Sequence, residues 1–191
     1  MPGDSRPSES GPKQRGGTRA WSAAMLSLAT FATFAACGSG PAPETWAGQV
    51  CGALAPWRAQ IAELNTHAQQ QMSAASTPAQ AQAGLVRLLA GGESASETAR
   101  AAVVAAGTPD VDGGDEIADR FAASLSQTRD AYAHARGDLQ ALPTNDAEAF
   151  YDKVASVFAT LDAEYTRSGV DTADLHSAEL RNAFDKVDRC Q

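Results

Sequence analysis

DEIADRFAASLSQTRDAYAHARGDLQAL, residues 115–142, has the clearest helical pattern in the chain. Its apolar residues recur every three or four positions, which places them on one face of an α-helix and the polar residues on the other. That face consists of Ile117, Phe121, Leu125, Thr128, Tyr132, Leu139 and Leu142. We therefore expect a long amphipathic helix that buries one side against other helices.

A turn precedes this helix. GTPDVDGG, residues 107–114, combines Gly, Pro and Asp in the way tight turns do. The acidic residues 110, 112, 115 and 116 do not have the spacing of a helix–loop–helix calcium site, which needs Gly at loop position six and Glu at position twelve. We expect Asp115 and Glu116 to cap the helix and to lie at the positive end of its dipole.

Two further helices are predicted before the turn. Residues 77–78, Thr-Pro, have the form of an N-cap followed by Pro in the first turn. They predict a helix to residue 106, either one helix with a soft middle at the two glycines 91–92 or two helices in line. A stripe of apolar residues from Trp46 to Met72 predicts the first helix. Pro56 falls inside it and predicts a kink or a short separate first turn.

Two helices are predicted after residue 142. Pro143 ends the long helix, and residues 145–148 have capping-box spacing. The wide aromatic face that follows, up to Tyr165, predicts a helix at the centre of the core, which ends at residues 168–169. A short turn is expected at 171–172. Ser177 is then expected to cap a last short helix before Cys190.

The fold class follows from these helices. No stretch shows a sustained alternation of apolar and polar β-branched residues, so no strand is predicted. Four main helices and a short C-terminal helix, joined by short turns, predict an all-α protein with an antiparallel helical bundle. The bundle domain is expected to span residues 44–191.

The residues before the bundle look like an export signal. Residues 1–19 are basic and rich in Pro, Gly and Ser, and residues 20–36 are apolar but too few and too polar for a good spanning helix. Phe34-Ala35-Ala36-Cys37 resembles the cleavage motif of bacterial lipoprotein signals, with Phe34 where an aliphatic residue is usual. The resemblance implies that 1–36 is removed and that Cys37 carries a diacylglyceryl thioether on the extracytoplasmic face of the cell membrane. Residues 37–43 would be a flexible tether.

Two other fates remain open for this segment. Residues 1–36 could be removed by ordinary secretory cleavage after Ala36, or they could remain as an uncut anchor. The first would release the chain, and the second would hold it through protein rather than lipid.

The two remaining cysteines predict a disulfide. Cys51 and Cys190 form an even pair in an exported chain, and such pairs are usually oxidised. The alternatives are two free thiols or two ligands of a metal. A disulfide would join the first helix to the last and place the C-terminus near the anchored end.

Charge excludes one class of partner. The chain carries a formal charge of −8, of which residues 1–36 contribute +2, so the part from Cys37 onward carries −10. Nucleic-acid binding needs clustered Lys and Arg, which this part lacks, so we expect no nucleic-acid partner. Anionic headgroups would repel such a domain, so membrane attachment is assigned to the lipid.

No constellation of an enzyme or cofactor site is recognised. A nucleophile needs a positioned base, and the three histidines are in no catalytic motif. Asp130, His134 and Asp138 share the polar side of their helix, and we expect a solvated charge cluster there rather than a metal site. Glu63 and His67 are four residues apart, which does not fit a di-iron motif. We therefore expect a non-enzymatic protein with no catalytic, cofactor or metal site.

A second resemblance covers most of residues 45–191. CGALAPW (51–57), GTPDVDGG (107–114) and SAELRNAF (177–184) before Cys190 are similar to small secreted or lipid-anchored helical proteins of actinobacteria. That resemblance implies location and fold, and no catalytic residue. The sequence thus favours a lipid-anchored binding or scaffold module whose partner is an envelope protein. The alternative is a carrier of a small apolar ligand or metal, with a cavity between the second and fourth helices.

Overall fold

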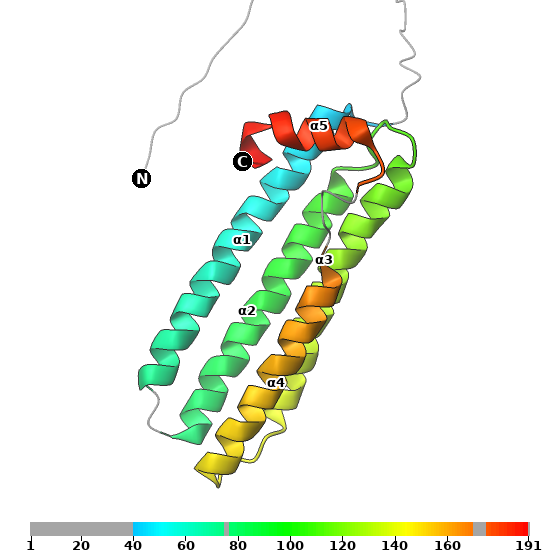
Figure 1. Cartoon of the computed structure of the whole chain (residues 1–191). Helices are drawn as coiled ribbons and strands as arrows, with labels where there is room; N and C mark the ends of the chain where they lie inside the picture. The colour runs from blue at the N-terminus through cyan, green and yellow to red at the C-terminus, as the bar shows by residue number, and fades with distance from the viewer. Residues whose placement is uncertain (1–39, 75–76, 170–174, 191) are drawn as a thin grey trace, which may run out of the picture. The chain divides into compact units, whose positions relative to one another are not determined.

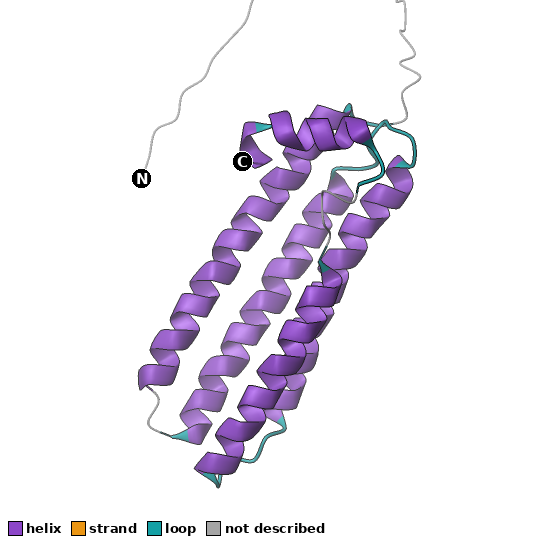
Figure 2. Cartoon of the chain, viewed as in Figure 1, coloured by secondary structure: helices purple, strands orange, loops and turns teal. Residues whose placement is uncertain are grey.

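The computed structural model describes residues 40–74, 77–169 and 175–190. It contains four long helices and a short one, followed by a single 3₁₀ turn (Figure 1). These are α1 (Pro43–Ala74), α2 (Pro78–Ala105), α3 (Gly114–Gln140), α4 (Ala147–Ser168), α5 (Ala178–Lys186) and η2 (Asp188–Cys190). The described residues include no strand (Figure 2). The predicted fold class, four main helices and a short C-terminal one, is confirmed.

The long helices form an open bundle whose centre is the α2–α3 pair. These two helices have the most extensive contact, α1 packs against α2, and α4 packs against α3. Over the described residues α1 and α4 do not pack along one another, and α4 barely touches α2. The prediction that the aromatic helix is central is therefore wrong. Tyr151 and Tyr165 of α4 are each 38% exposed because the helix has only one packed side.

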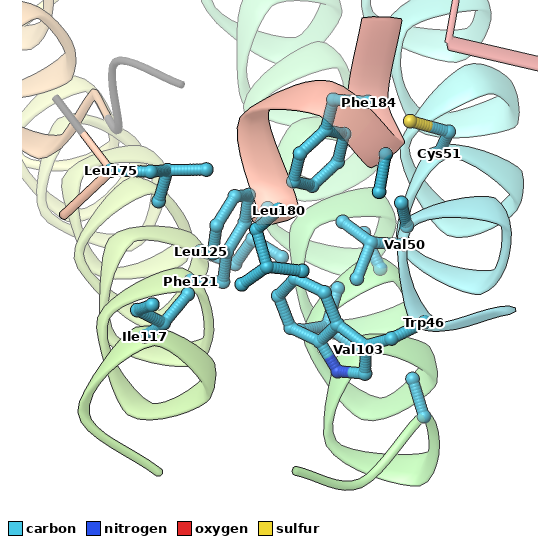
Figure 3. Packing of buried hydrophobic residues seen from close by; sticks show 14 residues of the cluster. Trp46, Val50, Cys51, Val103, Ile117, Phe121, Leu125, Leu175, Leu180 and Phe184 are labelled. Carbon is cyan, nitrogen blue, oxygen red and sulfur yellow. The ribbon is translucent and has the colours of Figure 1, made fainter. Parts of the chain in front are cut away.

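One apolar cluster lies at the end of the bundle that holds α5. Trp46 of α1 is fully buried and meets the Phe121 and Phe184 rings edge-on, with centroids 5.4 and 6.1 Å away (Figure 3). Its indole nitrogen donates a hydrogen bond of 2.7 Å to the carbonyl of Gly107. Because the ring packs on α3 and α5 while its polar atom is satisfied by the α2–α3 turn, Trp46 fixes the relative positions of four segments. A second cluster, built around Leu89, Leu139 and Phe150, fills the opposite half.

Two glycines in α2 admit close packing rather than weakening the helix. α2 is one continuous helix, so the alternative of two helices in line is wrong. A Cβ on Gly92 would lie 2.7 Å from the Tyr132 ring, and one on Gly91 would lie 2.8 Å from a Leu64 methyl. The absence of side chains there lets α1 and α3 approach the α2 backbone.

α1 also runs through its internal proline. Pro56 lies inside a single helix of 32 residues, so the predicted separate first turn is wrong. Its side chain is exposed, and on the solvent side of a helix water can satisfy the carbonyl that loses its amide partner.

The helix caps agree with the sequence at two of four positions. Thr77 and Ser177 cap α2 and α5 by accepting hydrogen bonds from Gln80 and Leu180 amides, as predicted. α3 instead begins after Gly113, which has φ 69° and makes no side-chain cap, and Asp115 and Glu116 lie in the first turn.

α4 is capped one residue later than predicted. The Asp146 carboxylate, rather than the Asn145 side chain, accepts from the Ala149 amide at 3.1 Å. The end of α4 at residues 168–169 is as predicted. The turn expected at 171–172 lies outside the described residues.

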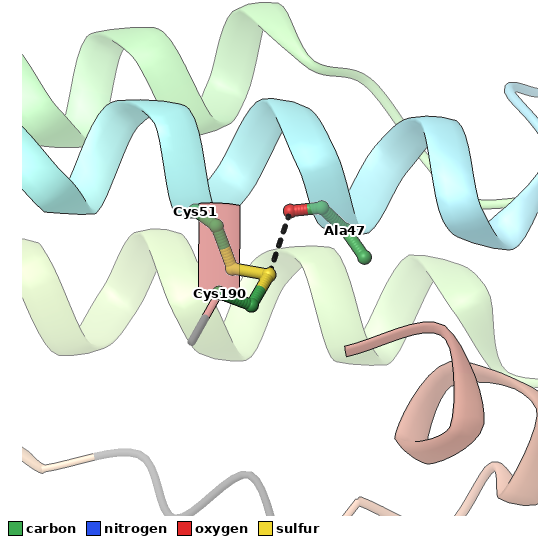
Figure 4. Close-up of a disulfide and its surroundings, with 3 residues drawn as sticks. All are labelled: Ala47, Cys51 and Cys190. Carbon is green, nitrogen blue, oxygen red and sulfur yellow. Dashed lines mark hydrogen bonds between the residues drawn. A yellow bond between two sulfur atoms is a disulfide. The ribbon is translucent and has the colours of Figure 1, made fainter. Parts of the chain in front are cut away.

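The disulfide lies where α5 and η2 cross the first turns of α1. Cys51 and Cys190 are bonded, with Cα atoms 5.2 Å apart (Figure 4). The Cys190 sulfur also lies 3.7 Å from the Ala47 carbonyl oxygen. This is a contact rather than a hydrogen bond, because a disulfide sulfur carries no proton. The C-terminal turn is thereby held beside the start of the first helix.

The last residues of the predicted tether are held by the α2–α3 turn. The amide of Asp110 donates a 3.0 Å hydrogen bond to the Pro41 carbonyl. A Cβ on Gly40 would lie only 1.9 Å from the Thr108 carbonyl oxygen, so this position needs glycine. Flexibility was expected over 37–43, but the chain is fixed from Gly40 onward.

Candidate functional site

A pocket of about 340 Å³ opens on the side of the bundle where α1 and α4 do not meet. Its walls come from α1 and α3, and the C-terminal end of α4 closes one side. Four of the lining side chains are apolar: Leu54, Trp57, Phe121 and Leu125. The volume is at the lower end of the range of about 300–1,000 Å³ that small-molecule sites have.

Hydrogen bonds tie the end of α4 to α3 on the polar side of the pocket. The Thr128 and Ser168 hydroxyl oxygens are 2.9 Å apart, and both side chains are buried. The Ser168 hydroxyl is 2.7 Å from the Tyr165 carbonyl oxygen, and the Ser124 hydroxyl donates to the Ser168 carbonyl. These bonds satisfy the hydroxyl protons within the protein, so the polar side of the pocket needs no ligand for its own stability.

A second set of hydrogen bonds fixes the Trp57 wall. The Trp57 indole nitrogen donates to the Ser96 hydroxyl oxygen at 3.1 Å. The Ser96 hydroxyl donates in turn to the Gly92 carbonyl at 2.9 Å. Ser96 is fully buried, so the indole is anchored to the α2 backbone through one side chain. The ring is therefore a preformed surface rather than a mobile one.

Arg58 and Tyr165 supply the polar groups at the mouth. Arg58 is exposed and makes no hydrogen bond or ion pair with another described residue. Of the described residues that line this pocket, Arg58 alone carries a charge. The described lining residues include no carboxylate and no histidine.

Tyr132 lies on α3 one turn beyond Thr128, against Gly92. Burial, and to a smaller extent the Tyr165 phenol, raise the pKa of Tyr132 to about 12. Tyr132 is therefore a neutral packing residue at physiological pH.

Two other hollows on the described surface have acidic linings. One, of about 420 Å³, lies between α3 and α4 and includes His134, Asp138 and Glu164. The other, of about 520 Å³, lies beside α5 and includes Asp110, Asp112 and Glu179. No group of three metal-ligating side chains is assembled in the described part of the chain.

All three residues of the predicted charge cluster on α3, Asp130, His134 and Asp138, are exposed to solvent. The Asp130 carboxylate pairs with Arg129 at 2.7 Å, whereas the His134 imidazole lies 3.6 Å from the Glu164 carboxylate of α4. Elsewhere Glu63 and His67 form a long, exposed contact of 4.0 Å on α1.

Of the other site residues named from the sequence, the two that the structure describes do not line the pocket. Cys37 is outside the described residues, and Cys51 and Cys190 are joined at the end of the bundle. None of the described helices is long and apolar enough to cross a membrane.

The pocket itself was not predicted from the sequence. A cavity was expected between the second and fourth helices, but α2 and α4 barely touch, and the pocket instead involves α1, α3 and α4. Trp46 and Trp57 both lie on the apolar stripe that predicts the first helix, a position typical of core anchors. Trp46 is one, whereas Trp57 is half-buried and lines the pocket. The available signal was an arginine directly after Trp57 at the edge of the apolar stripe.

Comparison of the chain with protein-family models, curated proteins and solved structures finds no match.

Proposed function

We propose that this protein is a non-enzymatic binding module that a lipid on Cys37 holds at the extracytoplasmic face of the cell membrane. The observation that carries the binding role is the open side of the bundle between α1 and α4, with its preformed apolar pocket. A bundle that served only as a rigid spacer would have no need to leave Trp57 and Tyr165 at a hollow surface.

The anchor is supported by the Phe34–Cys37 motif and by the geometry of the chain that follows it. The described structure begins at Gly40, so residues 38 and 39, and hence three Cα–Cα steps, separate Cys37 from it. They span at most about 10 Å when extended. The module would therefore stand directly on the membrane surface, on the end that carries α5 and the disulfide.

Photo-crosslinking from the pocket mouth tests the binding role. A photoreactive benzophenone amino acid would replace Tyr165 in the full chain in its own cells. The matched control is the same replacement at Tyr151, a second α4 tyrosine with the same 38% exposure and no place in the pocket. Adducts from position 165 and none from position 151 are expected. Equal adducts at both positions, or none at either, would contradict a binding role for this face.

The mass of the adduct separates two kinds of partner. A protein adduct would favour a scaffold that holds another envelope component. A small adduct would favour the second candidate function, a carrier of a small apolar ligand. The volume of about 340 Å³ and the aromatic walls of the pocket favour this second function. Native mass spectrometry of gently extracted protein would detect the same ligand without crosslinking.

A further inference from the structure

We propose that the α1–α3–α4 pocket binds a small organic anion with an apolar body, and that Arg58 holds its anionic group at the mouth. This inference rests on the carrier form of the proposed function and names the chemistry of its ligand. It comes from the contrast between the apolar walls and the single charge beside them.

The walls define the body of the ligand. Leu54, Trp57 and Phe121 offer apolar and aromatic surface, and the Trp57 ring is fixed by its hydrogen bond to Ser96. Ser124, Thr128 and Ser168 already direct their protons to acceptors within the protein. A ligand rich in hydroxyl or amide groups would lose hydration without finding free donors there. An apolar or aromatic body loses no such hydration.

The charge defines the head of the ligand. Arg58 is an exposed cation with no counter-charge among the described residues, in a domain that is otherwise strongly acidic. The two other hollows have carboxylates among their described lining residues, whereas this one has none among the residues that the structure describes. A guanidinium binds carboxylate, sulfonate and phosphate groups through paired N–H donors. The Tyr165 phenol at the same mouth adds another donor.

The two requirements place the ligand in one orientation. Its body would lie against Trp57 with its head toward solvent at Arg58. A neutral apolar molecule would fill the pocket but leave the arginine unused. A doubly charged or highly polar anion would be drawn to Arg58 but would not enter.

A pair of fluorescent probes separates the two requirements. Anilinonaphthalene sulfonate (ANS) carries a sulfonate, and N-phenylnaphthylamine (NPN) is the same molecule without it. Both would be titrated into the folded protein in low-salt buffer, and affinity and stoichiometry read from fluorescence and calorimetry. We expect one saturable site per chain and ANS affinity on the order of fivefold to tenfold above that of NPN, as one charge-assisted contact provides. Added salt should reduce the difference in affinity between ANS and NPN, because it screens the charge of Arg58.

Three variants locate the site. Arg58→Gln should abolish the advantage of ANS and leave NPN binding unchanged. Arg87→Gln removes another exposed helix arginine, which lies outside the pocket and has no ion-pair partner among the described residues, and it should not change the binding of either probe. Leu54→Glu should weaken both probes by placing a carboxylate in the wall. Circular dichroism and melting temperature would establish that each variant is folded, because ANS also binds loosened structures.

The outcomes distinguish this inference from the function on which it rests. One outcome would be NPN binding that is lost in Leu54→Glu, with no higher affinity for ANS and no effect of Arg58→Gln. This outcome would overturn the inference that the ligand is an anion held by Arg58, and it would support the carrier function for an apolar ligand. The absence of a saturable site for either probe would overturn both the anion-binding inference and the carrier function. Loss of ANS binding in Arg87→Gln as well would show a diffuse attraction and would also overturn the role of Arg58.

Discussion

Removal of the Cys51–Cys190 bond should destabilise the fold by an amount that the structure allows us to calculate. The bond spans 139 residues. In the chain-entropy model, a loop of this length lowers the entropy of the unfolded chain by about 17 cal/mol/K, which is worth roughly 5 kcal/mol at 25 °C. Measured values are usually smaller, so we expect a loss of about 3 to 5 kcal/mol. That is a large share of a typical net stability of about 5 to 15 kcal/mol.

The two single variants and the double variant should lose nearly the same free energy of unfolding. Cys51→Ala breaks the bond and also leaves a small gap, since Cys51 is 5% exposed, whereas Cys190 is only partly buried. We expect Cys51→Ala to lose about 1 kcal/mol more than Cys190→Ala through this gap. The double variant should match Cys51→Ala closely, because the bond can be lost only once.

Urea unfolding followed by fluorescence and circular dichroism would measure these losses. Trp46, fully buried beside the bond, is a suitable reporter. The urea dependence of the free energy should rise in all three variants, because the uncrosslinked unfolded chain exposes more surface. Wild-type protein in reductant should have a free energy of unfolding close to that of the variants. If the losses of the single variants instead add in the double variant, the cysteines act independently and the loop argument is refuted.

Three shorter predictions concern the anchor, the helix packing and one ion-pair network. Cys37→Ser should move the protein from the membrane fraction to the soluble fraction after a carbonate wash; retention would indicate an uncut segment at 20–36. Gly92→Ala should destabilise by about 1 to 3 kcal/mol because its Cβ would meet the Tyr132 ring at 2.7 Å. Gly137→Ala, with nothing within 4 Å of its Cβ, should be neutral or stabilising by up to about 1 kcal/mol, and equal losses would refute the packing argument. Hydrogen bonds from two arginines lower the pKa of Glu97 to about 2 from 4.5, so its stabilising contribution should be present above pH 4.5 and disappear toward pH 2. The melting temperatures of wild type and Glu97→Gln should then converge as pH falls, and a constant difference would contradict this.

The helices could be predicted because their pattern is local. The repeat in 115–142 and the caps at Thr77 and Ser177 depend on neighbours within a few residues. The cap of α4 was misassigned because Asn145 and Asp146 are both good caps, and the choice depends on how the chain leaves α3. Local pattern therefore gives the helices with errors of a residue or so at their ends.

The candidate site could not be predicted because it depends on which helices fail to touch. The aromatic face of α4 is broad enough for a central helix, and nothing within residues 150–165 indicates that one side of it remains open. The glycines at 91–92 look like weak points until the Tyr132 and Leu64 side chains are placed against them. Arg58 directly follows Trp57 in the sequence, but its significance comes from α3 and α4 residues more than sixty positions away.

The bond between the first and last helices also determines how the molecule would carry mechanical load. Tension applied between an anchor at Cys37 and the C-terminal residue would pass through the first turns of α1 to Cys51. It would then cross the disulfide to Cys190 and reach the C-terminal residue directly. Residues 52–189, which include α2, α3, α4 and the pocket, would lie outside that path. A pull on the tail would stretch only the ends of the chain. Reduction of the disulfide would place the whole bundle under the same tension.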